Sequence, residues 1–263
     1  MTLDPKTDTP HSQPQEGHYA LTALQLLTRL PVRPLAGFEA GWVDRSAAYF
    51  PLAGFIVGLV AAVVLILAAG IWPAPIPAVL AVVAGIAVTG ALHEDGLADT
   101  VDGLGGGAPA EQKLAIMKDS RLGTYGAIAL IVALSLKVFA LSALAPIDAA
   151  FALILAHMAA RAVPVVAAAW LPYVGDASAA KVPPMKPTPG RMWCAVVLGL
   201  APFLLIPMAP ALLALGLGAL AASGLLGRAK HALGGVTGDV LGAAEQVFEV
   251  AVLLGLAAGG GAG

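Results

Sequence analysis

The chain has 263 residues, of which 59% are hydrophobic and only 11% are charged, and its formal net charge is −2. Its mean hydropathy is +0.88. These values exclude an ordinary soluble domain, in which about 45–50% of the residues are apolar and about 25% are charged. The composition therefore predicts an integral membrane protein.

Two segments precede the first long apolar run. Residues 1–18 are polar and contain several prolines, which favours a disordered tail over a cleaved signal peptide. In residues 19–30, one side of a helix would carry the leucines Leu21, Leu24 and Leu27, and the other side would carry polar residues. This pattern predicts a helix that lies in the membrane interface.

Apolar runs that could cross a bilayer then recur along the chain. A hydrocarbon core about 30 Å thick requires about 20 apolar residues in a helix. We expect one all-α, polytopic membrane domain over residues 19–263, with seven spans near residues 49–70, 76–92, 124–145, 149–172, 192–207, 211–226 and 239–258. The proline-rich stretch 192–226 leaves six or eight spans as alternatives.

The basic residues fall in alternate connections between these expected spans. Lysines and arginines occur before the first span and after the second, fourth and sixth spans, whereas the opposite connections contain none. The positive-inside rule assigns the basic side to the cytoplasm. We therefore expect a multi-pass protein of the cell (inner) membrane, with a cytoplasmic N-terminus and a cytoplasmic active-site loop at residues 93–123.

An acidic stretch, "HEDGLADTVDG" (93–103), begins that loop. In a helix, Asp95, Asp99 and Asp102 are spaced i, i+4 and i+7 and point in nearly the same direction. Like charges on one stripe repel one another, so the pattern favours neutralisation by cations over simple solvation, which is the alternative. Carboxylate oxygens with no cysteine nearby favour Mg²⁺, or Mn²⁺, over zinc. Because bound magnesium often takes substrate phosphates as further ligands, the stripe predicts phosphate chemistry.

Two residues beside this stripe receive different assignments. Glu94 lies about 100° from the stripe on a helix and is a candidate outer metal ligand. His93 lies about 160° from it, and we expect a structural or hydrogen-bonding role.

The next polar stretch, "KLAIMKDSRLGTYG" (113–126), follows a short helix that Pro109 would open and Gly123 would close. It returns three charged residues to the cytoplasmic end of the third expected span. Asp119 is a candidate to complete the metal site. Lys118 and Arg121 are candidate ligands of a diphosphate, Arg121 through its planar fork and Lys118 as a point charge. The alternative is that these two cations only fix the orientation in the membrane.

These stretches resemble the signature of a known family. "HEDGLADTVDG" followed by "KLAIMKDSRLGTYGAIAL" resembles the cobalamin synthase (adenosylcobinamide-GDP ribazoletransferase) family. Three further stretches are similar to the same family, and together they cover most of the chain: "LTRLPVR" (27–33), "YFPLAGFIVG" (49–58) and "GGVTGDVLGAAEQVFEV" (234–250).

The resemblance implies a membrane enzyme of late cobamide assembly. Such an enzyme joins adenosylcobinamide-GDP to α-ribazole, or to α-ribazole 5′-phosphate, and releases GMP with the help of a divalent metal. The expected catalytic and metal-binding residues are Asp95, Asp99, Asp102 and Asp119, one of which could serve as the base.

The same resemblance draws attention to acidic residues in the last expected span. Asp239 lies near the cytoplasmic edge and is a candidate substrate-binding residue, as is Glu245. Glu245 and Glu249 are spaced i, i+4, and acids inside a membrane helix are costly enough to be functional candidates. The leading alternative is pairing with the other charged or polar residues inside spans, Lys137, His157 and Arg161.

Two rival functions remain on the sequence alone. "DTVDG" (99–103) partly imitates a CDP-alcohol phosphotransferase, although the Ala-Arg pair and the later Gly–Asp–Asp series of that family are absent. A cation-coupled transporter could use the charged residues inside spans, but transporters usually bind at the membrane midplane, whereas the densest acidic cluster lies at the surface. The expected partners are the lipid bilayer and the two substrates, not nucleic acid, and a homo-oligomer is compatible with the sequence.

Overall fold

The computed structural model describes residues 16–32, 41–106, 109–176 and 183–260. Throughout these ranges the chain is helical or irregular, and no β-strand is present. The all-α prediction is therefore confirmed. The helices are α1 (Glu16–Leu27), α2 (Trp42–Ser46), η1 (Ala47–Tyr49), α3 (Phe50–Ala69), α4 (Ile76–Thr89), α5 (Leu92–Gly106), α6 (Ala110–Met117), α7 (Thr124–Ser142), α8 (Pro146–Ala160), α9 (Ala162–Trp170), α10 (Pro189–Leu200), η2 (Ala201–Leu205), α11 (Met208–Leu233) and α12 (Gly238–Gly260).

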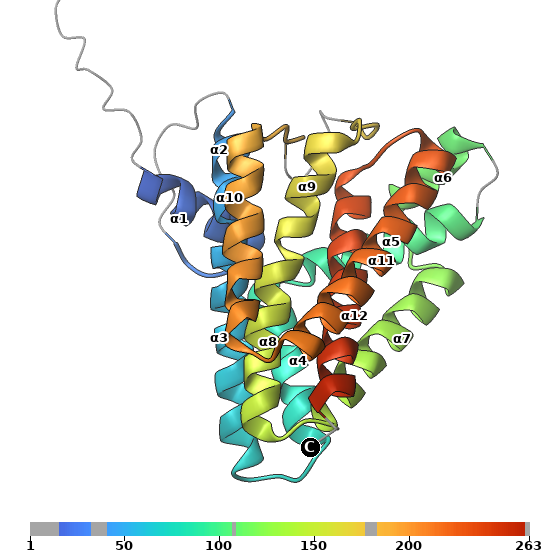
Figure 1. Cartoon of the computed structure of the whole chain (residues 1–263). Coiled ribbons are helices and arrows are strands. Elements are labelled where there is room, and N and C mark those ends of the chain that lie inside the picture. The colour runs from blue at the N-terminus through green and yellow to red at the C-terminus, as the bar shows by residue number, and fades with distance from the viewer. Residues whose placement is uncertain (1–15, 33–40, 107–108, 177–182, 261–263) are drawn as a thin grey trace, which may run out of the picture.

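The long helices form a bundle whose successive members run in opposite directions (Figure 1). Five helical segments of the described chain are long and apolar enough to span a membrane: Trp42–Ala69, Thr124–Ser142, Pro146–Trp170, Met208–Leu233 and Gly238–Gly259. A sixth span exists if α4 and α5, which meet at 91°, are counted together. The polytopic prediction is confirmed.

The number of spans differs from the seven expected. Helix α4 has 14 residues, which corresponds to about 21 Å of helix, and it is too short to qualify without α5. The expected span 192–207 is the shorter apolar segment Pro189–Leu205, in which α10 gives way to the tighter turn η2. Pro202 and Pro207 explain this ending, because proline cannot continue an α-helix hydrogen-bond ladder.

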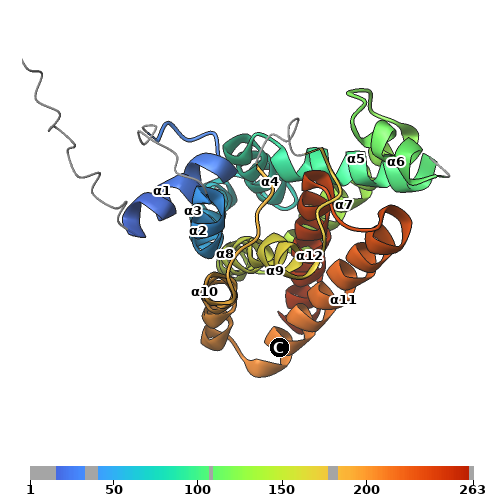
Figure 2. The ribbon, with the colours of Figure 1, turned by 90° about the horizontal axis from the view of Figure 1, so that it is seen from above.

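Helix α1 lies along the upper edge of the bundle (Figures 1 and 2). Tyr19, Ala23 and Leu27 are buried against the protein, whereas Leu21 is 43% exposed. The expected helix is therefore present, but it begins at Glu16, inside the segment that we expected to be a disordered tail. Residues 1–15 of that tail lie outside the described residues.

Small residues allow the central helices to approach closely. Gly54 and Gly58 of α3 face α8: a β-carbon at Gly54 would collide with the His157 carbonyl oxygen, and one at Gly58 would lie 2.8 Å from the Ile154 α-carbon. Gly255 of α12 packs in the same way against the backbone of Ala214 in α11. This spacing of small residues is typical of helix pairs in membranes, where close packing replaces the hydrophobic effect.

Candidate functional site

The site is built on a corner between α4 and α5. Helix α4 ends at Thr89, and the next two residues have positive φ values: +66° at Gly90 and +59° at Ala91. The positive φ values turn the chain out of the α4 axis, so that α5 leaves at 91°. The side chain of Arg29 packs against Gly90 so closely that a β-carbon at Gly90 would collide with it. The backbone N–H of Arg29 donates a hydrogen bond of 2.7 Å to the Val88 carbonyl. Arg29 thus holds this corner in place.

Two glycines then bring α5 against the beginning of α12. A β-carbon at Gly96 would lie 2.8 Å from the Asp239 carbonyl oxygen, and one at Gly242 would lie 3.5 Å from the His93 α-carbon. The acidic stretch of α5 and the start of α12 are therefore neighbours, although more than 140 residues separate them in sequence. Asp239, which the sequence singled out as a substrate-site candidate, lies beside α5.

The three aspartates of the stripe have different surroundings. Helix α5 does cover residues 92–106, so their helical spacing is confirmed. Asp95 is exposed and Asp99 is half-buried. Asp102 is buried, and its two carboxylate oxygens accept hydrogen bonds of 2.8 Å from the backbone N–H groups of Gly123 and Gly126. Asp102 therefore caps the N-terminus of α7, a role that complements the helix dipole.

The charged residues after α6 lie at the surface of the same end of the bundle. Arg121 Nε donates to Asp119 Oδ1 at 3.0 Å, and this hydrogen bond holds the pKa of the Asp119 carboxyl at about 2. Lys118 Nζ lies 3.4 Å from Asp176 Oδ2 in the segment after α9. Both cations are exposed, so a phosphate could reach them from the solvent.

A residue that the sequence did not single out, Tyr173, lies beside the start of α12. Its segment pairs with the residues before α12: Val236 N–H donates to the Pro172 carbonyl and Val174 N–H to the Val236 carbonyl, both at 2.9 Å. Burial and the nearby Asp239 charge raise the pKa of the Tyr173 hydroxyl. No motif pointed to it, because the pairing joins segments about 60 residues apart.

The donor chemistry fits a hard divalent cation, but the ligand set is incomplete in the arrangement shown. Within the described ranges, no group of three or more His, Cys, Asp or Glu side chains converges in a manner that could hold a metal. Asp102 is engaged by α7 and Asp119 by Arg121. Asp95 and Asp99 share one face of α5, whose Gly96 packs against the Asp239 backbone, and carboxylates are the donors that magnesium prefers. The metal assignments remain predictions.

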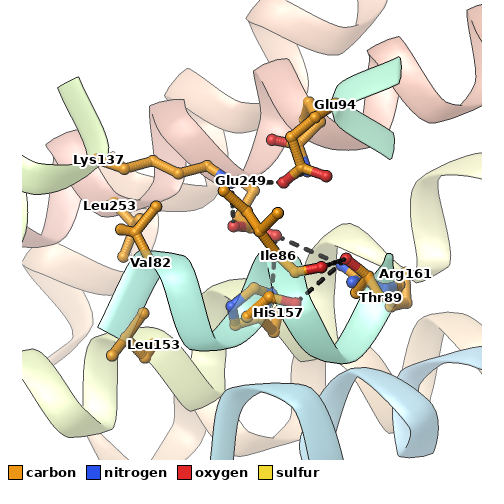
Figure 3. Close-up of a pocket in the computed structure, with 12 residues that line it drawn as sticks. Val82, Ile86, Thr89, Glu94, Lys137, Leu153, His157, Arg161, Glu249 and Leu253 are labelled. Atoms are coloured by element: carbon orange, nitrogen blue, oxygen red, sulfur yellow. Dashed lines mark hydrogen bonds and ion pairs between the residues drawn. The ribbon is translucent and has the colours of Figure 1, made fainter. Parts of the chain in front are cut away.

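We call the surface formed by Asp95 and Asp99 of α5 and the start of α12 the acidic face. A second group of charged residues lies inside the bundle. We call it the buried charge cluster, and it consists of His93, Glu94, Lys137, His157, Arg161, Glu245, Gln246 and Glu249. Figure 3 shows Lys137, His157 and Arg161 directed toward Glu249. The distances are 2.7 Å from Lys137 Nζ to Glu249 Oε1 and 2.9 Å from His157 Nδ1 to Glu249 Oε2.

Glu245 completes the cluster on the side of α5. It pairs with Arg161, and its Oε2 lies 3.2 Å from His93 Nδ1. The interhelical pairing that the sequence offered as the alternative for these acids is therefore present. Glu245 is fully buried and lies about 9 Å along α12 from Asp239, so its assignment as a substrate-binding residue gains no support from its surroundings, and Glu94, which is also buried, is likewise turned inward.

The pocket next to the buried charge cluster is small (Figure 3). It is lined by residues of α4, α5, α7, α8 and α12, among them Glu94, Lys137 and His157, and it has room for about one water molecule. A nucleobase or a corrinoid does not fit there. Any large substrate must bind outside this cluster.

Comparison with known proteins decides the family. The model of the cobalamin-5-phosphate synthase family matches residues 19–257. The chain belongs to the cobalamin-5-phosphate synthase family. It is 44% identical to the adenosylcobinamide-GDP ribazoletransferase of Leptothrix cholodnii over 93% of this chain and 96% of that protein. The proteins of the same name from Ralstonia pickettii (44%, over 90% and 94%) and Sinorhizobium medicae (42%, over 89% and 94%) are similar to it as well. No solved structure matches.

In this member of the cobalamin-5-phosphate synthase family, the stretches that carry the sequence resemblance meet around α5. Arg29, from the first of these stretches, packs at the α4–α5 corner, and residues 234–250 supply the start of α12 that lies against Gly96. The stretch 49–58 contacts α8, which carries His157. Neither rival reading, a CDP-alcohol phosphotransferase or a transporter, receives support from the comparisons.

Proposed function

We propose that this chain is an adenosylcobinamide-GDP ribazoletransferase, which joins adenosylcobinamide-GDP to α-ribazole, or to its 5′-phosphate, and releases GMP. The observation that carries the proposal is the approach of Gly96 to Asp239. It joins the two most acidic stretches of the family resemblance at one end of the bundle. The names of the similar proteins, which cover nearly the whole chain, support the same activity.

The reaction is a phosphoryl substitution. A ribose hydroxyl of α-ribazole attacks the phosphorus on the cobinamide side, a new P–O bond forms, the bond to the GMP oxygen breaks, and the hydroxyl proton passes to a carboxylate or to water. Such transfers depend on positioning and on neutralising the charge of the phosphates. Bound Mg²⁺, or Mn²⁺, would supply that neutralisation and lower the pKa of the attacking hydroxyl.

The residues of the chain divide this work. Asp95 and Asp99 on α5, with Asp239 beside them, would hold the metal at the acidic face. Arg121 and Lys118 are exposed at the same end of the bundle and would bind the diphosphate. Arg121 now donates to Asp119 through its guanidinium fork. To bind the diphosphate through the same fork, Arg121 would release Asp119 and donate to phosphate oxygens instead.

The orientation in the membrane follows from charge. The connections that carry the basic residues, including α6 and the segment before α10, lie at one end of the bundle, and the α3–α4 and α7–α8 connections lie at the other (Figure 1). The positive-inside rule places the first end, with the acidic face, in the cytoplasm. The enzyme would then meet its water-soluble substrates at the cytoplasmic surface of the cell membrane.

The test uses the full chain, purified and reconstituted in lipid vesicles. Release of GMP should require adenosylcobinamide-GDP, α-ribazole and Mg²⁺ together, and EDTA should stop it. Formation of CMP from a CDP-alcohol would support the phosphotransferase instead. Accumulation of a solute in the vesicles without GMP release would support the transporter.

A further inference from the structure

The direction of α5 is not fixed by the helix that precedes it. Because two residues with positive φ separate α4 from α5, no continuous helical hydrogen-bond ladder joins them. The orientation of α5 relative to α12 therefore depends on the contacts that α5 makes with its neighbours: Asp102 ties its far end to α7, and its first turn packs against α12. Gly96 and Gly242 set how closely they approach, but glycine contacts alone leave one helix able to slide or rotate on the other.

The first turn of α5 carries two polar side chains that point to α12. His93 Nδ1 lies 3.2 Å from Glu245 Oε2, and Glu94 Oε1 accepts a hydrogen bond of 3.3 Å from Gln246 Nε2. All four residues are buried. His93 and Glu94 directly precede Asp95 on α5, and Glu245 and Gln246 lie one to two turns after Asp239 on α12.

Such buried polar contacts need a reason, because replacing a buried ion pair by apolar residues is often neutral or stabilising. The best-attested reason is that they fix one register between helices. Here the register between α5 and α12 decides where Asp95 and Asp99 lie relative to Asp239. A displacement of about 1 Å in such an arrangement can reduce the rate of a reaction about 10²-fold.

We propose that His93 and Glu94, through Glu245 and Gln246, are positioning residues that set the register of the α5 carboxylates against Asp239. The proposal rests on the proposed function. It gives four residues of the buried charge cluster, His93, Glu94, Glu245 and Gln246, a role in that function in which they do not touch the substrate. In the rest of the cluster, His157 and Lys137 pair with Glu249 and connect α12 to α8 and α7, and Lys137 Nζ also lies 3.9 Å from Glu94 Oε1 of α5.

The chain offers a matched control for this idea. His157 and His93 are both buried histidines whose Nδ1 lies about 3 Å from a glutamate of α12, at 2.9 Å and 3.2 Å respectively. Only His93 belongs to α5. His93→Leu and His157→Leu therefore remove equivalent polar contacts, and His93→Asn keeps an N–H donor near the position of Nδ1.

Kinetics on the reconstituted full-length variants give the first readout. We expect His93→Leu to lower kcat for GMP release by about 10- to 100-fold, the range found when residues that orient active-site ligands are lost, with KM for adenosylcobinamide-GDP changed much less. His93→Asn should recover most of the rate. His157→Leu should lower the melting temperature about as much as His93→Leu but leave kcat per folded protein near the wild-type value.

A distance measurement gives the second readout. Spin labels on Gly106→Cys in α5 and Gly238→Cys at the start of α12, in a Cys194→Ser background, report the register directly. His93→Leu should shift or broaden the label distance, whereas His157→Leu should not. Equal loss of kcat in the two leucine variants, or a slow His93→Leu protein with an unchanged label distance, overturns the proposal. If the wild-type protein releases no GMP at all, the proposed function fails, and the label distances still test the positioning role.

Discussion

The buried carboxylate of Asp102 accepts a hydrogen bond of 2.8 Å from the backbone N–H of Gly126, in the first turn of α7. The two residues are 24 positions apart in the sequence. This contact, together with the equivalent one from Gly123, ties α5 to the start of α7 and buries Asp102, whereas Asp95 is exposed. The regular acidic stripe thus contains one residue with a structural role.

Asparagine substitutions should separate the two roles. Asp99→Asn should lower GMP release by about 10- to 100-fold or more with little change in melting temperature, because it removes a candidate metal ligand and keeps the size. Asp102→Asn should lower the melting temperature, because its amide N–H₂ must face a backbone N–H at a cost of about 1–3 kcal/mol. Activity assays and thermal unfolding of both proteins check this. Loss of activity in Asp102→Asn at an unchanged melting temperature would instead make Asp102 a ligand.

Enlarging Gly96 should push α5 away from α12. The alanine β-carbon would lie 2.8 Å from the Asp239 carbonyl oxygen, which belongs to the backbone and cannot rotate away. We expect Gly96→Ala to lose most of its kcat. Gly227→Ala is the control, because no atom lies within 4 Å of its β-carbon position in α11, and it should keep full activity. Wild-type turnover by Gly96→Ala would show that the approach of the two helices is not needed.

The charge-conserving change Arg121→Lys separates diphosphate binding from membrane orientation. Lysine keeps the positive charge but loses the planar fork, so kcat/KM for adenosylcobinamide-GDP should fall about 10-fold or more while expression and orientation stay unchanged. Arg228→Lys is the control, because Arg228 is exposed near the end of α11, and this variant should have wild-type kinetics. Identical steady-state kinetics for the two variants would leave Arg121 as an orientation residue only.

The contact that fastens α1 to the bundle should persist in acid. Hydrogen bonds from Arg191 and from the Tyr49 hydroxyl lower the pKa of Glu16 from 4.5 to about 2. Because the pKa of Glu16 is lower when α1 is docked, the ionised carboxylate stabilises the docked form fully at pH values above about 4.5. This stabilisation is lost as the pH falls from about 4.5 towards about 2. Carboxyl carbon NMR of the protein should give a Glu16 midpoint near 2, and Arg191→Gln should raise it towards 4.5. A wild-type midpoint near 4.5 would contradict the contact.

Labelling of single cysteines tests which end of the bundle faces the cytoplasm. In a Cys194→Ser background, a membrane-impermeant thiol reagent added to intact cells should miss Gly190→Cys, at the start of α10, and should label Asp148→Cys, at the start of α8. Both positions are exposed. The opposite labelling pattern would invert the proposed orientation.

The sequence predicted the features that depend on local spacing. Polar residues four positions apart inside apolar helices, such as His157 with Arg161 and Glu245 with Glu249, indicated interhelical pairing, because unpaired charges in a membrane are too costly. The spacing of the aspartates on α5 was likewise correct. The sequence could also place this helix at one end of the bundle, since the basic connections gather there.

Features that depend on distant contacts or on unusual backbone could not be predicted. Gly90 and Ala91 lie at the end of an apolar run, and nothing in their neighbourhood indicated two positive φ values and a 91° turn. The capping role of Asp102 and the place of Tyr173 both depend on residues far away in the sequence. The short α10 could not be told from a full span, because apolar residues continue through the prolines that end it.

The glycines of α3 differ from other glycines in what a genetic screen should recover. A side chain at Gly54 collides with a main-chain carbonyl of α8, and every amino acid has that carbonyl, so no second substitution in α8 can act as a suppressor. Gly105 of α5 is different, because the three atoms nearest to its β-carbon position, the closest at 3.0 Å, all belong to the side chain of Tyr125. A defect of Gly105→Ala should therefore be suppressed by Tyr125→Ala, whereas revertants of Gly54→Ala should restore the glycine codon itself.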